Sequence, residues 1–294
     1  MITVFTPTYN RAYILPNLYK SLLTQTNKDF EWVIVDDGSN DNTEQLCNSW
    51  IENCKNFKIT YIKQKNQGKH IAINIGVKNA KGELFFIVDS DDYLSSDAIE
   101  QLYCFYKQIK DDDKFAGISG MRAYTNGKRI GGAFPFETID CSMIDIRNKY
   151  KIKGDMAEAF KTNILRQYPF PQFEGEKFLD VVAVWNEIGS KYLLRYFNKK
   201  ICFGEYIADG ITKNIHREFR GSPKGAMFVF MQTIRIKNTS LLQKIKCAIK
   251  YWRYTIFYKG DKTKDMKPVL WMYLFIPIGI LLYFNDTLRR YKNS

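Results

Sequence analysis

The chain is poor in the residues that build zinc and redox sites. It has two histidines and six cysteines in 294 residues, and no two cysteines have the C-x-x-C spacing. Zinc sites need cysteine and histidine at short, regular spacing, so the sequence predicts none. We expect the cysteines to be buried or idle reduced thiols, as in a reducing cytosol.

Two phosphate-binding motifs and a leader segment are also absent. The sequence contains neither G-x-x-x-x-G-K-[ST] nor G-x-G-x-x-G, which argues against P-loop phosphoryl transfer and dinucleotide oxidoreduction. No basic segment precedes the first apolar run, so no signal peptide is predicted and we expect a cytoplasmic protein. The uncharged apolar run over residues 269–284 has 16 residues, fewer than the roughly 17–20 that a membrane-spanning helix needs.

The net charge of +13 is concentrated at the end of the chain. Residues 213–294 hold 17 lysines and arginines but four aspartates and glutamates, whereas residues 1–212 hold 27 of each kind. A basic tail of this kind is typical of a nucleic-acid binder, of a protein on an anionic membrane, or of a solvated face.

Residues 1–115 alternate short apolar runs with helix-like segments. Strands are predicted over residues 2–6, 31–36, 57–62 and 84–88, and helices over 13–24, 42–53, 69–80 and 97–107. Such alternation is typical of βαβ units, and continuous apolar runs fit strands covered on both faces. We therefore predict an α/β fold with a mostly parallel central sheet and helices on both faces. Residues 116–212 are more irregular, with a helix-like run over 178–188, and complete the same domain.

Four polar loops follow the four predicted strands, at residues 6–10, 36–39, 66–69 and 89–92. Ligands of an open parallel sheet bind outside the carboxyl ends of its strands, so four polar loops at one edge predict a ligand site. One such loop alone would be no more than a turn.

Asp89 and Asp91 have the D-x-D spacing of a metal site. Two carboxylates one residue apart at a strand end can turn to the same side and hold Mn²⁺ or Mg²⁺, which also takes oxygens from substrate phosphates. The alternative is that Asp91, Asp92 and Asp97 interact with the dipole of the next helix.

Together these segments resemble glycosyltransferase family 2, inverting enzymes of the GT-A fold. The matching segments are VFTPTYNR from residue 4, SLLTQT from 21, FEWVIVDDGSND from 30, NQGK from 66 and FIVDSDD from 86. The resemblance covers residues 1–115 closely and 150–212 less closely. It implies a catalytic domain over 1–212, with a nucleotide-binding half (1–115) and an acceptor half (116–212). It also implies transfer from a nucleotide-sugar, UDP-linked in our first choice, in bacterial capsule, O-antigen or other surface polysaccharide synthesis.

The resemblance also implies which residues contact the donor. Residues 7–9 and Asp37 would hold the base, with Asp36 supporting their loop. Asp89 would contact the ribose or a metal-bound water, and Asp91 would ligate the metal that bridges the diphosphate. The implied donor-binding residues are Pro7, Thr8, Tyr9, Asp36, Asp37, Lys69, Asp89, Ser90, His216 and Arg217. The last two follow a stretch, residues 206–212, that looks like the loop closing over the donor; a structural histidine is the alternative for His216.

An inverting transfer needs a base for the proton of the acceptor hydroxyl. In the family this is an acidic residue early in a helix that carries a tryptophan a few positions later. Asp180 precedes Trp185 by five positions and is our first choice, with Glu176 as the alternative. Val181 departs from the usual Glu-Asp pair, and a helix cap is the alternative role of Asp180.

The basic tail favours a membrane over nucleic acid. Apolar residues share one helical face between 241 and 256 with lysines between them, and the apolar run over 269–284 follows. This pattern is typical of binding to anionic lipid headgroups, here through residues 240–292. It predicts a peripheral or monotopic protein on the inner face of the plasma membrane with a lipid-linked acceptor. A helical pair buried against the catalytic domain is the alternative.

Two other functions fit parts of the sequence. Val181 favours a catalytically silent nucleotide-sugar-binding protein. A sugar nucleotidyltransferase can share a similar α/β domain, but the chain lacks the Gly-rich basic N-terminal loop that a triphosphate substrate would need.

Overall fold

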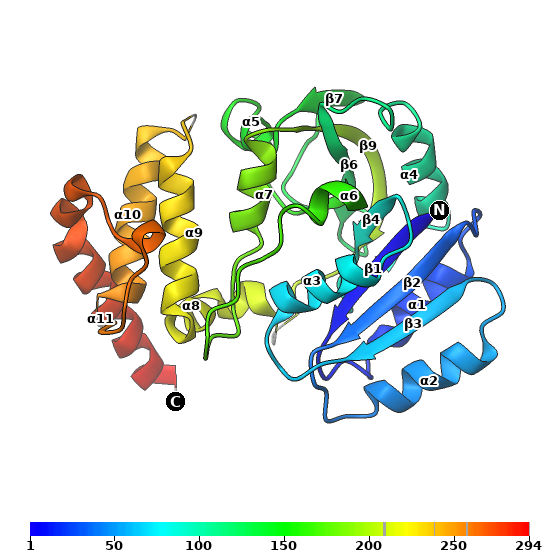
Figure 1. Cartoon of the computed structure of the whole chain (residues 1–294), viewed down its shortest axis with the longest axis horizontal. Helices are drawn as coiled ribbons and strands as arrows, with labels where there is room; N and C mark the ends of the chain where they lie inside the picture. The colour runs from blue at the N-terminus through cyan, green and yellow to red at the C-terminus, as the bar shows by residue number, and fades with distance from the viewer. Residues whose placement is uncertain (208–209, 238, 257, 294) are drawn as a thin grey trace. The chain divides into compact units, whose positions relative to one another are not determined.

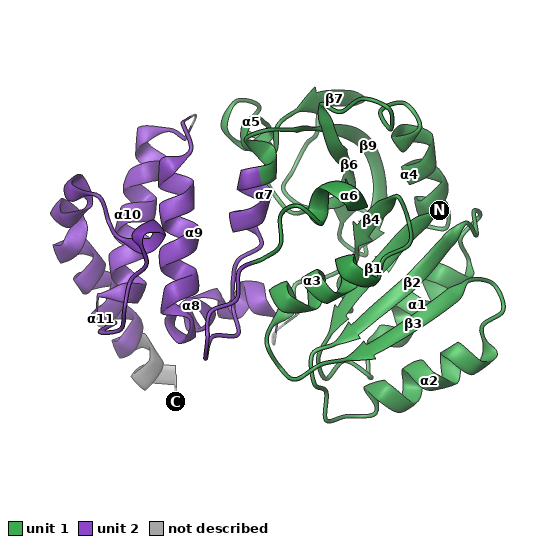
Figure 2. Cartoon of the chain, in the orientation of Figure 1, with its two compact units in different colours: residues 1–170, 188–207 green, residues 171–187, 208–294 purple. Residues whose placement is uncertain are grey.

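The computed structural model describes residues 1–207, 210–237, 239–256 and 258–293, with residues 289–293 described by their backbone alone. The chain divides into two compact units (Figure 2). Unit 1 contains Met1–Phe170 and Ile188–Ile207, and unit 2 contains Pro171–Glu187 and Ala208–Ser294. A segment from the middle of the chain therefore belongs to the unit formed by its end.

Unit 1 is built on a sheet whose first four strands are parallel, as predicted. They lie in the order β3-β2-β1-β4 and are β1 (Ile2–Thr8), β2 (Phe30–Asp36), β3 (Lys58–Lys63) and β4 (Leu84–Ile87). The helices between them are α1 (Leu15–Leu23), α2 (Thr43–Asn53) and α3 (Lys69–Asn79). The carboxyl ends of these strands therefore meet at one edge of the sheet.

Later strands extend the sheet in mixed directions. β8 (Met156–Lys161) runs antiparallel to β4, β6 (Phe115–Ala123) antiparallel to β8, and β9 (Leu193–Phe203) parallel to β6. The short strands β5 (Tyr93–Leu94) and β7 (Thr138–Cys141) pair with β9. The accompanying helices are α4 (Ala98–Tyr106), α5 (Met143–Asn148) and α6 (Thr162–Leu165). The described residues form one nine-stranded sheet.

Helices cover both faces of this sheet, as predicted (Figure 1). On one face, strand residues such as Trp32 form a core with residues of α1, α2 and α4. On the other, the rings of Phe5 and Phe85 stack with centroids 4.9 Å apart. Here α3 lies so close that a Cβ at Gly76 would be 2.2 Å from the Phe5 ring.

Unit 2 is helical in its described residues. It contains α7 (Val182–Gly189), whose end belongs to unit 1, α8 (Ile211–Gly221), α9 (Pro223–Arg235), α10 (Leu241–Thr255), η1 (Lys264–Met266), η2 (Leu270–Phe275) and α11 (Ile276–Asn293). The predicted basic amphipathic helix is α10, which buries Cys247, Ala248, Tyr251 and Trp252 on one side.

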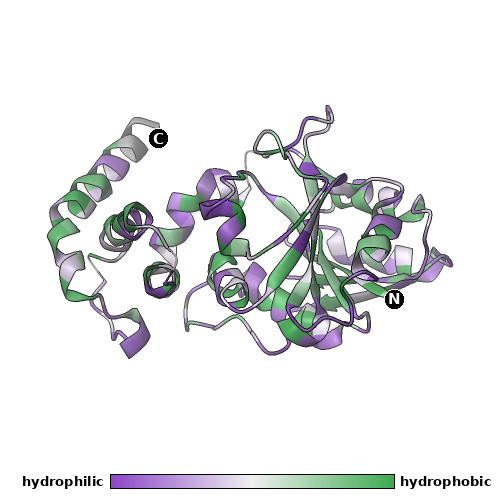
Figure 3. Ribbon diagram, turned by 90° about the horizontal axis from the view of Figure 1, so that it is seen from above, coloured by the Kyte–Doolittle hydropathy of each residue, from purple (hydrophilic) through white to green (hydrophobic). Residues whose placement is uncertain are grey.

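The predicted apolar run forms η2 and the first turns of α11. Together they give one helical stretch, Leu270–Leu288, that is long and apolar enough to cross a membrane by length and composition, and 11% of it is buried. A soluble core helix of this length would be mostly buried. The first turns of α11 are largely hydrophobic in Figure 3.

Candidate functional site

The loops after β1 and β2 are joined through Asp36. Its carboxylate accepts hydrogen bonds from the Ser39 amide at 2.8 Å, from the Ser39 hydroxyl at 2.6 Å and from the Tyr61 hydroxyl at 2.5 Å. The Ser39 hydroxyl in turn accepts from the Asn10 amide at 2.8 Å. Asp36 therefore supports the turn that follows β1 from beneath.

Pro7 and Thr8 lie in β1 itself, opposite Val35 and Asp36, rather than in a loop. Tyr9 follows the strand and its side chain is exposed. The Thr8 hydroxyl is buried and has no hydrogen-bond partner among the described residues. Because a buried hydroxyl is normally paired, this atom is available to a ligand at the strand end.

Asp37 holds the loop that leads into α3. One carboxylate oxygen accepts from the Gln64 side-chain amide at 2.6 Å and the Gln67 backbone amide at 2.7 Å, and the other from the Gly68 amide at 2.8 Å. Gly68 has φ 97°, a left-handed conformation that favours glycine. A carboxylate has about four acceptor positions, so Asp37 keeps little capacity beyond this loop.

Lys69 and Asp89 form an ion pair at the sheet edge. The Lys69 Nζ lies 2.5 Å from Asp89 Oδ1, and both side chains are about one-third exposed. Burial disfavours the ammonium ion, but Asp89 outweighs it and raises the pKa of Lys69. Burial also disfavours the carboxylate, but Lys69 lowers the pKa of Asp89. Both groups are therefore charged near neutral pH.

Asp92 also forms an ion pair, with Arg122 of β6, but this pair is more deeply buried. The Arg122 Nη2 lies 2.5 Å from Asp92 Oδ1, and the side chains are 12% and 5% exposed. Gly204 makes room for this pair, because a Cβ there would lie 1.9 Å from Asp92 Oδ1. The Cys202 thiol lies 3.5 Å from the other oxygen. Asp92 thus fastens the acidic loop to β6 and β9.

Asp91 lies between these two anchored carboxylates and has no ion pair or side-chain hydrogen bond among the described residues. Burial, and then the charge of Asp89, raise the pKa of Asp91. A cation would relieve both effects. The described residues hold no group of three or more His, Cys, Asp or Glu side chains suited to a metal. Asp89 and Asp91 fit Mn²⁺ or Mg²⁺ because these ions fill their coordination with water and substrate phosphates. Ser90, between them, is buried.

Two residues near this edge were not found from the sequence. The sequence offered a signal for each. Arg122 is a single charged residue directly after the apolar run FAGISGM, and Glu158 is an acid within the apolar run MAEAF. Glu158 lies in β8, beside β4, and makes no ion pair among the described residues. Burial, opposed by Arg147, raises the pKa of Glu158 to about 7.

Both predicted catalytic acids lie in unit 2. The two carboxylate oxygens of Glu176 accept from the backbone amides of Lys224 and Gly225, each at 2.8 Å, and so cap the start of α9. Asp180 accepts from the Val182 amide at 3.0 Å and caps α7, the helix that carries Trp185. Glu176 is therefore committed to a helix end, and Asp180 has the position expected of the base at the start of a helix.

His216 and Arg217 lie within α8 rather than in a loop. The His216 Nδ1 is hydrogen-bonded to the Tyr254 hydroxyl of α10. Burial, and then Arg253, lower the pKa of His216, so its ring is neutral at pH 7. Arg217 is 63% exposed and pairs with Glu218 at 3.1 Å. Residues 208–209, in the predicted closing loop, lie outside the described residues.

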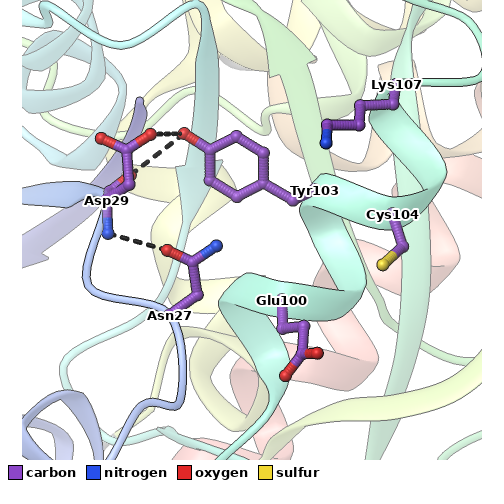
Figure 4. A pocket seen from close by; sticks show the side chains of 6 residues that line it. All are labelled: Asn27, Asp29, Glu100, Tyr103, Cys104 and Lys107. Atoms are coloured by element: carbon purple, nitrogen blue, oxygen red, sulfur yellow. Dashed lines mark hydrogen bonds between the residues drawn. The ribbon is translucent and has the colours of Figure 1, made fainter.

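A pocket of about 280 Å³ lies at the opposite edge of the sheet (Figure 4). Its lining residues are Asn27, Asp29, Glu100, Tyr103, Cys104 and Lys107. Asp29 immediately precedes β2, and its carboxylate lies 3.2 Å from the amino group of Met1. The pocket is therefore at the amino ends of the strands and contains none of the predicted site residues.

The model of the family described as glycosyl transferase family 2 matches residues 3–153, more than half of the chain. The chain belongs to glycosyltransferase family 2. This agrees with the resemblance found in its motifs, and the matched segment includes every predicted donor-binding residue of unit 1.

Three relatives show how far the similarity extends. Glycosyltransferase GlyA of Streptococcus pneumoniae is 40% identical over 102 residues, which are 35% of this chain and 14% of GlyA. The Staphylococcus aureus poly(ribitol-phosphate) beta-N-acetylglucosaminyltransferase TarP is 36% identical over 114 residues, 38% of this chain and 34% of TarP. An uncharacterised glycosyltransferase of Haemophilus influenzae is 24% identical over 285 residues, 96% of this chain and 98% of that protein. This chain thus spans a minor part of GlyA and TarP.

Two solved structures share the fold. S. aureus TarS 1–349 in complex with UDP-GlcNAc has a TM-score of 0.60 at 18% identity, over 86% of this chain and 71% of that one. The mannosyltransferase PcManGT from Pyrobaculum calidifontis, in complex with GDP-Man and Mn²⁺, has a TM-score of 0.55 at 17% identity, over 97% and 87%. The predicted GT-A fold is therefore confirmed.

Proposed function

We propose that the protein is a metal-dependent, inverting glycosyltransferase that moves a sugar from a UDP-sugar to a glycan acceptor in surface polysaccharide synthesis. The observation that carries the proposal is Asp91, a carboxylate without an ion pair between two ion-paired ones, after the parallel strand β4. The UDP-GlcNAc complex of TarS and the Mn²⁺ complex of PcManGT support the donor class and the metal.

In this proposal each residue has a task. Asp91 and Asp89 hold Mn²⁺ or Mg²⁺, which stabilises the charge of the leaving diphosphate when bound. Lys69 keeps Asp89 ionised and in place. Residues 7–9 and the remaining acceptor position of Asp37 contact the base, and Ser90 belongs to the same donor site. The donor roles of His216 and Arg217 stay predictions from the sequence.

We assign Asp180 as the base. Removing the acceptor proton requires a carboxylate oxygen within hydrogen-bond reach of the sugar hydroxyl. Both carboxylate oxygens of Glu176 are bonded to amides of α9. Asp180 also bonds an amide, that of Val182, but it lies at the start of α7, five residues before Trp185, where the resemblance implies the base. Glu176 then acts by fixing the end of α9.

We further propose that the protein works at the inner face of the plasma membrane on a lipid-linked acceptor, with no nucleic-acid partner. The support is the basic unit 2 and its apolar stretch Leu270–Leu288. The predicted contact surface, residues 240–292, includes Arg289, Arg290 and Lys292, whose side chains lie outside the described residues. The name of TarP, a poly(ribitol-phosphate) transferase, supports a cell-surface polymer as the acceptor class.

The first test is thermal unfolding of the purified chain with Mn²⁺ and UDP, GDP or dTDP. A ligand that binds the native state alone raises the melting temperature. We expect a metal-dependent rise with UDP that is lost in Asp91→Ala and kept in Asp111→Ala, a control whose side chain is 88% exposed. If none of the three nucleotides raises the melting temperature, the proposed donor site is wrong.

Val181 favours one second candidate, a silent nucleotide-sugar-binding protein. Product analysis separates it from the enzyme. A transferase releases UDP from a UDP-sugar in an Asp180-dependent manner, a silent binder releases nothing, and a nucleotidyltransferase would release pyrophosphate from UTP.

A further inference from the structure

The helical stretch formed by η2 and α11 has one face packed on α10. The Trp252 indole Nε1 donates to the Met272 carbonyl at 2.7 Å. Farther along, Gly279 lies so close that a Cβ there would be 2.5 Å from Trp252 Cβ. Such a close approach needs glycine and leaves no room for lipid or solvent between the helices.

The same face is held to unit 2 by charge. Asp286 of α11 accepts two hydrogen bonds from Arg253 of α10, at 2.6 and 2.7 Å, and lies 3.5 Å from Arg220 of α8. The three side chains are 13–16% exposed. Arg220 also donates to the Tyr283 carbonyl at 2.7 Å. A bidentate pair buried to this extent fixes which side of α11 faces the unit.

The opposite face is a stripe of exposed apolar side chains. Its members are 43–87% exposed, and we call them the leucine stripe: Leu270, Leu274, Ile278, Leu281, Phe284 and Leu288. They are separated by four, four, three, three and four residues, and this spacing places the members in α11 along one side of the helix. Single exposed leucines are ordinary on a soluble protein, but a continuous stripe marks an interaction surface. In Figures 1 and 3, α11 lies at the margin of unit 2.

The segment that contains the stripe, residues 213–294, carries mostly positive charge, with 17 lysines and arginines against four acids. Three of the four acids in residues 213–294, Glu218, Asp265 and Asp286, are already in ion pairs with arginines. The ten lysines between residues 213 and 267 form no ion pair among the described residues. Their charge is therefore available to an anionic surface.

We infer that the leucine stripe lies in the plane of an anionic phospholipid bilayer, with α11 parallel to the membrane and its Asp286 side facing the protein. This inference refines the proposed membrane association and rests on that part of the proposed function. The length of Leu270–Leu288 would allow a crossing. A crossing would, however, bring the basic helix α10, which packs on Met272 and Gly279 through Trp252, into the hydrocarbon with α11. That costs far more than a shallow, parallel insertion.

The first experiment is flotation of the full-length chain with phosphatidylcholine vesicles, with and without phosphatidylglycerol. We expect binding that requires the anionic lipid. Leu274→Glu with Leu281→Glu should weaken partitioning about tenfold or more, because it removes apolar contacts and adds charge of the wrong sign. Ile51→Glu with Val182→Glu, exposed apolar residues outside the stripe, is the control matched in charge and should bind normally.

The second experiment measures depth. A fluorophore is placed at Leu270→Cys, Leu281→Cys or Leu288→Cys in a Cys54→Ser, Cys104→Ser background, because the other four cysteines are buried. Fluorescence quenching by lipids that carry quenchers at known depths should place all three fluorophores at the same shallow depth in the bilayer. A deep position 281 between two shallow ends would show a spanning helix and overturn the inference.

UDP-induced stabilisation is measured in the same preparations. If UDP stabilises the protein but anionic vesicles do not bind it, the stripe inference fails while the proposed donor site stands. Loss of the UDP effect alone would count against the donor site instead. If the protein forms a dimer in solution that needs the leucine stripe, and does not bind vesicles, the stripe is a contact with a second copy of the chain. That result would also overturn the inference.

Discussion

The two units handle charged and apolar side chains in contrasting ways. In unit 1, buried acids accept hydrogen bonds: Glu31, for example, accepts from the Thr3 hydroxyl and the Lys81 amide. Asp91 and Glu158, both half-buried, depart from this rule because neither forms an ion pair or a hydrogen bond with another described residue. In unit 2 the mostly buried acid Asp286 forms ion pairs with two arginines. The exception in unit 2 is an apolar one, because the side chains of the leucine stripe are exposed to solvent.

This difference indicates which kind of ligand or surface each unit favours. An acid without a partner favours a cation, and apolar side chains without a cover favour an apolar phase. Each departure lies beside ion-paired acids, Asp89 and Asp92 in unit 1 and Asp286 in unit 2. On the proposals made above, unit 1 meets a charged, polar ligand and unit 2 a lipid surface, and each can be changed separately.

The largest effect is expected from Asp91→Asn. Loss of the carboxylate removes a metal ligand worth several kcal/mol in the transition state, so transfer should fall by about 10²–10³-fold. Without metal, the free energy of unfolding should be unchanged or higher, because burial and Asp89 raise the pKa of Asp91 and disfavour its charge. UDP-sugar turnover and urea unfolding measure the two effects. Substantial destabilisation with normal turnover would make Asp91 a structural residue.

Asp286→Asn tests the paired acid of unit 2. Removing one partner of a mostly buried ion pair leaves Arg253 and Arg220 uncompensated and should cost about 2–4 kcal/mol of unfolding free energy. Chemical denaturation followed by circular dichroism measures this cost, with Asp261→Asn, an exposed acid of the same unit, as control. Equal stability of the two variants would show that α11 is not held by this pair.

Much of unit 1 could be predicted because each strand there is a short apolar run bounded by polar residues. The run over 31–36 became Phe30–Asp36, and the four loops at the carboxyl ends follow from parallel order alone. Arg122 and Gly204 could not be placed in this way. Arg122 lies in β6 and Gly204 directly follows β9. The neighbours of these strands in the sheet are set by long-range, mixed pairing that no local pattern encodes.

The tail illustrates a second limit. Pro277 and Gly279 are residues that usually interrupt a helix, yet both lie in α11. A proline is tolerated in the first turn of a helix, where its missing N–H has no acceptor to bond, so Pro277 helps α11 begin. Gly279 allows the contact with Trp252. Which side of α11 remains exposed depends on α10, so the stripe is a property of packing rather than of sequence.

Glu158→Gln tests the second unpaired acid of unit 1 through pH. Burial raises the pKa of Glu158 from 4.5 to about 7, so the folded state binds this proton more tightly than the unfolded state. The free energy of unfolding should therefore fall as pH rises from about 4.5 to about 7. Gln removes that slope. The variant should match the parent at pH 4.5 and exceed it by about 1–2 kcal/mol at pH 8, after allowance for partial exposure. A parallel pH dependence of both proteins would contradict this.

The smallest effect is expected from Leu274→Asn in water. Leu274 is 77% exposed, whereas Met272, two residues earlier in η2, is fully buried. Leu274→Asn should change the unfolding free energy by less than about 0.5 kcal/mol, while Met272→Ala should cost about 2–5 kcal/mol. Guanidinium unfolding without lipid measures both. A cost at Leu274 approaching that at Met272 would mean that the stripe is already covered in solution, and the contrast between a satisfied interior and an uncovered surface in unit 2 would then disappear.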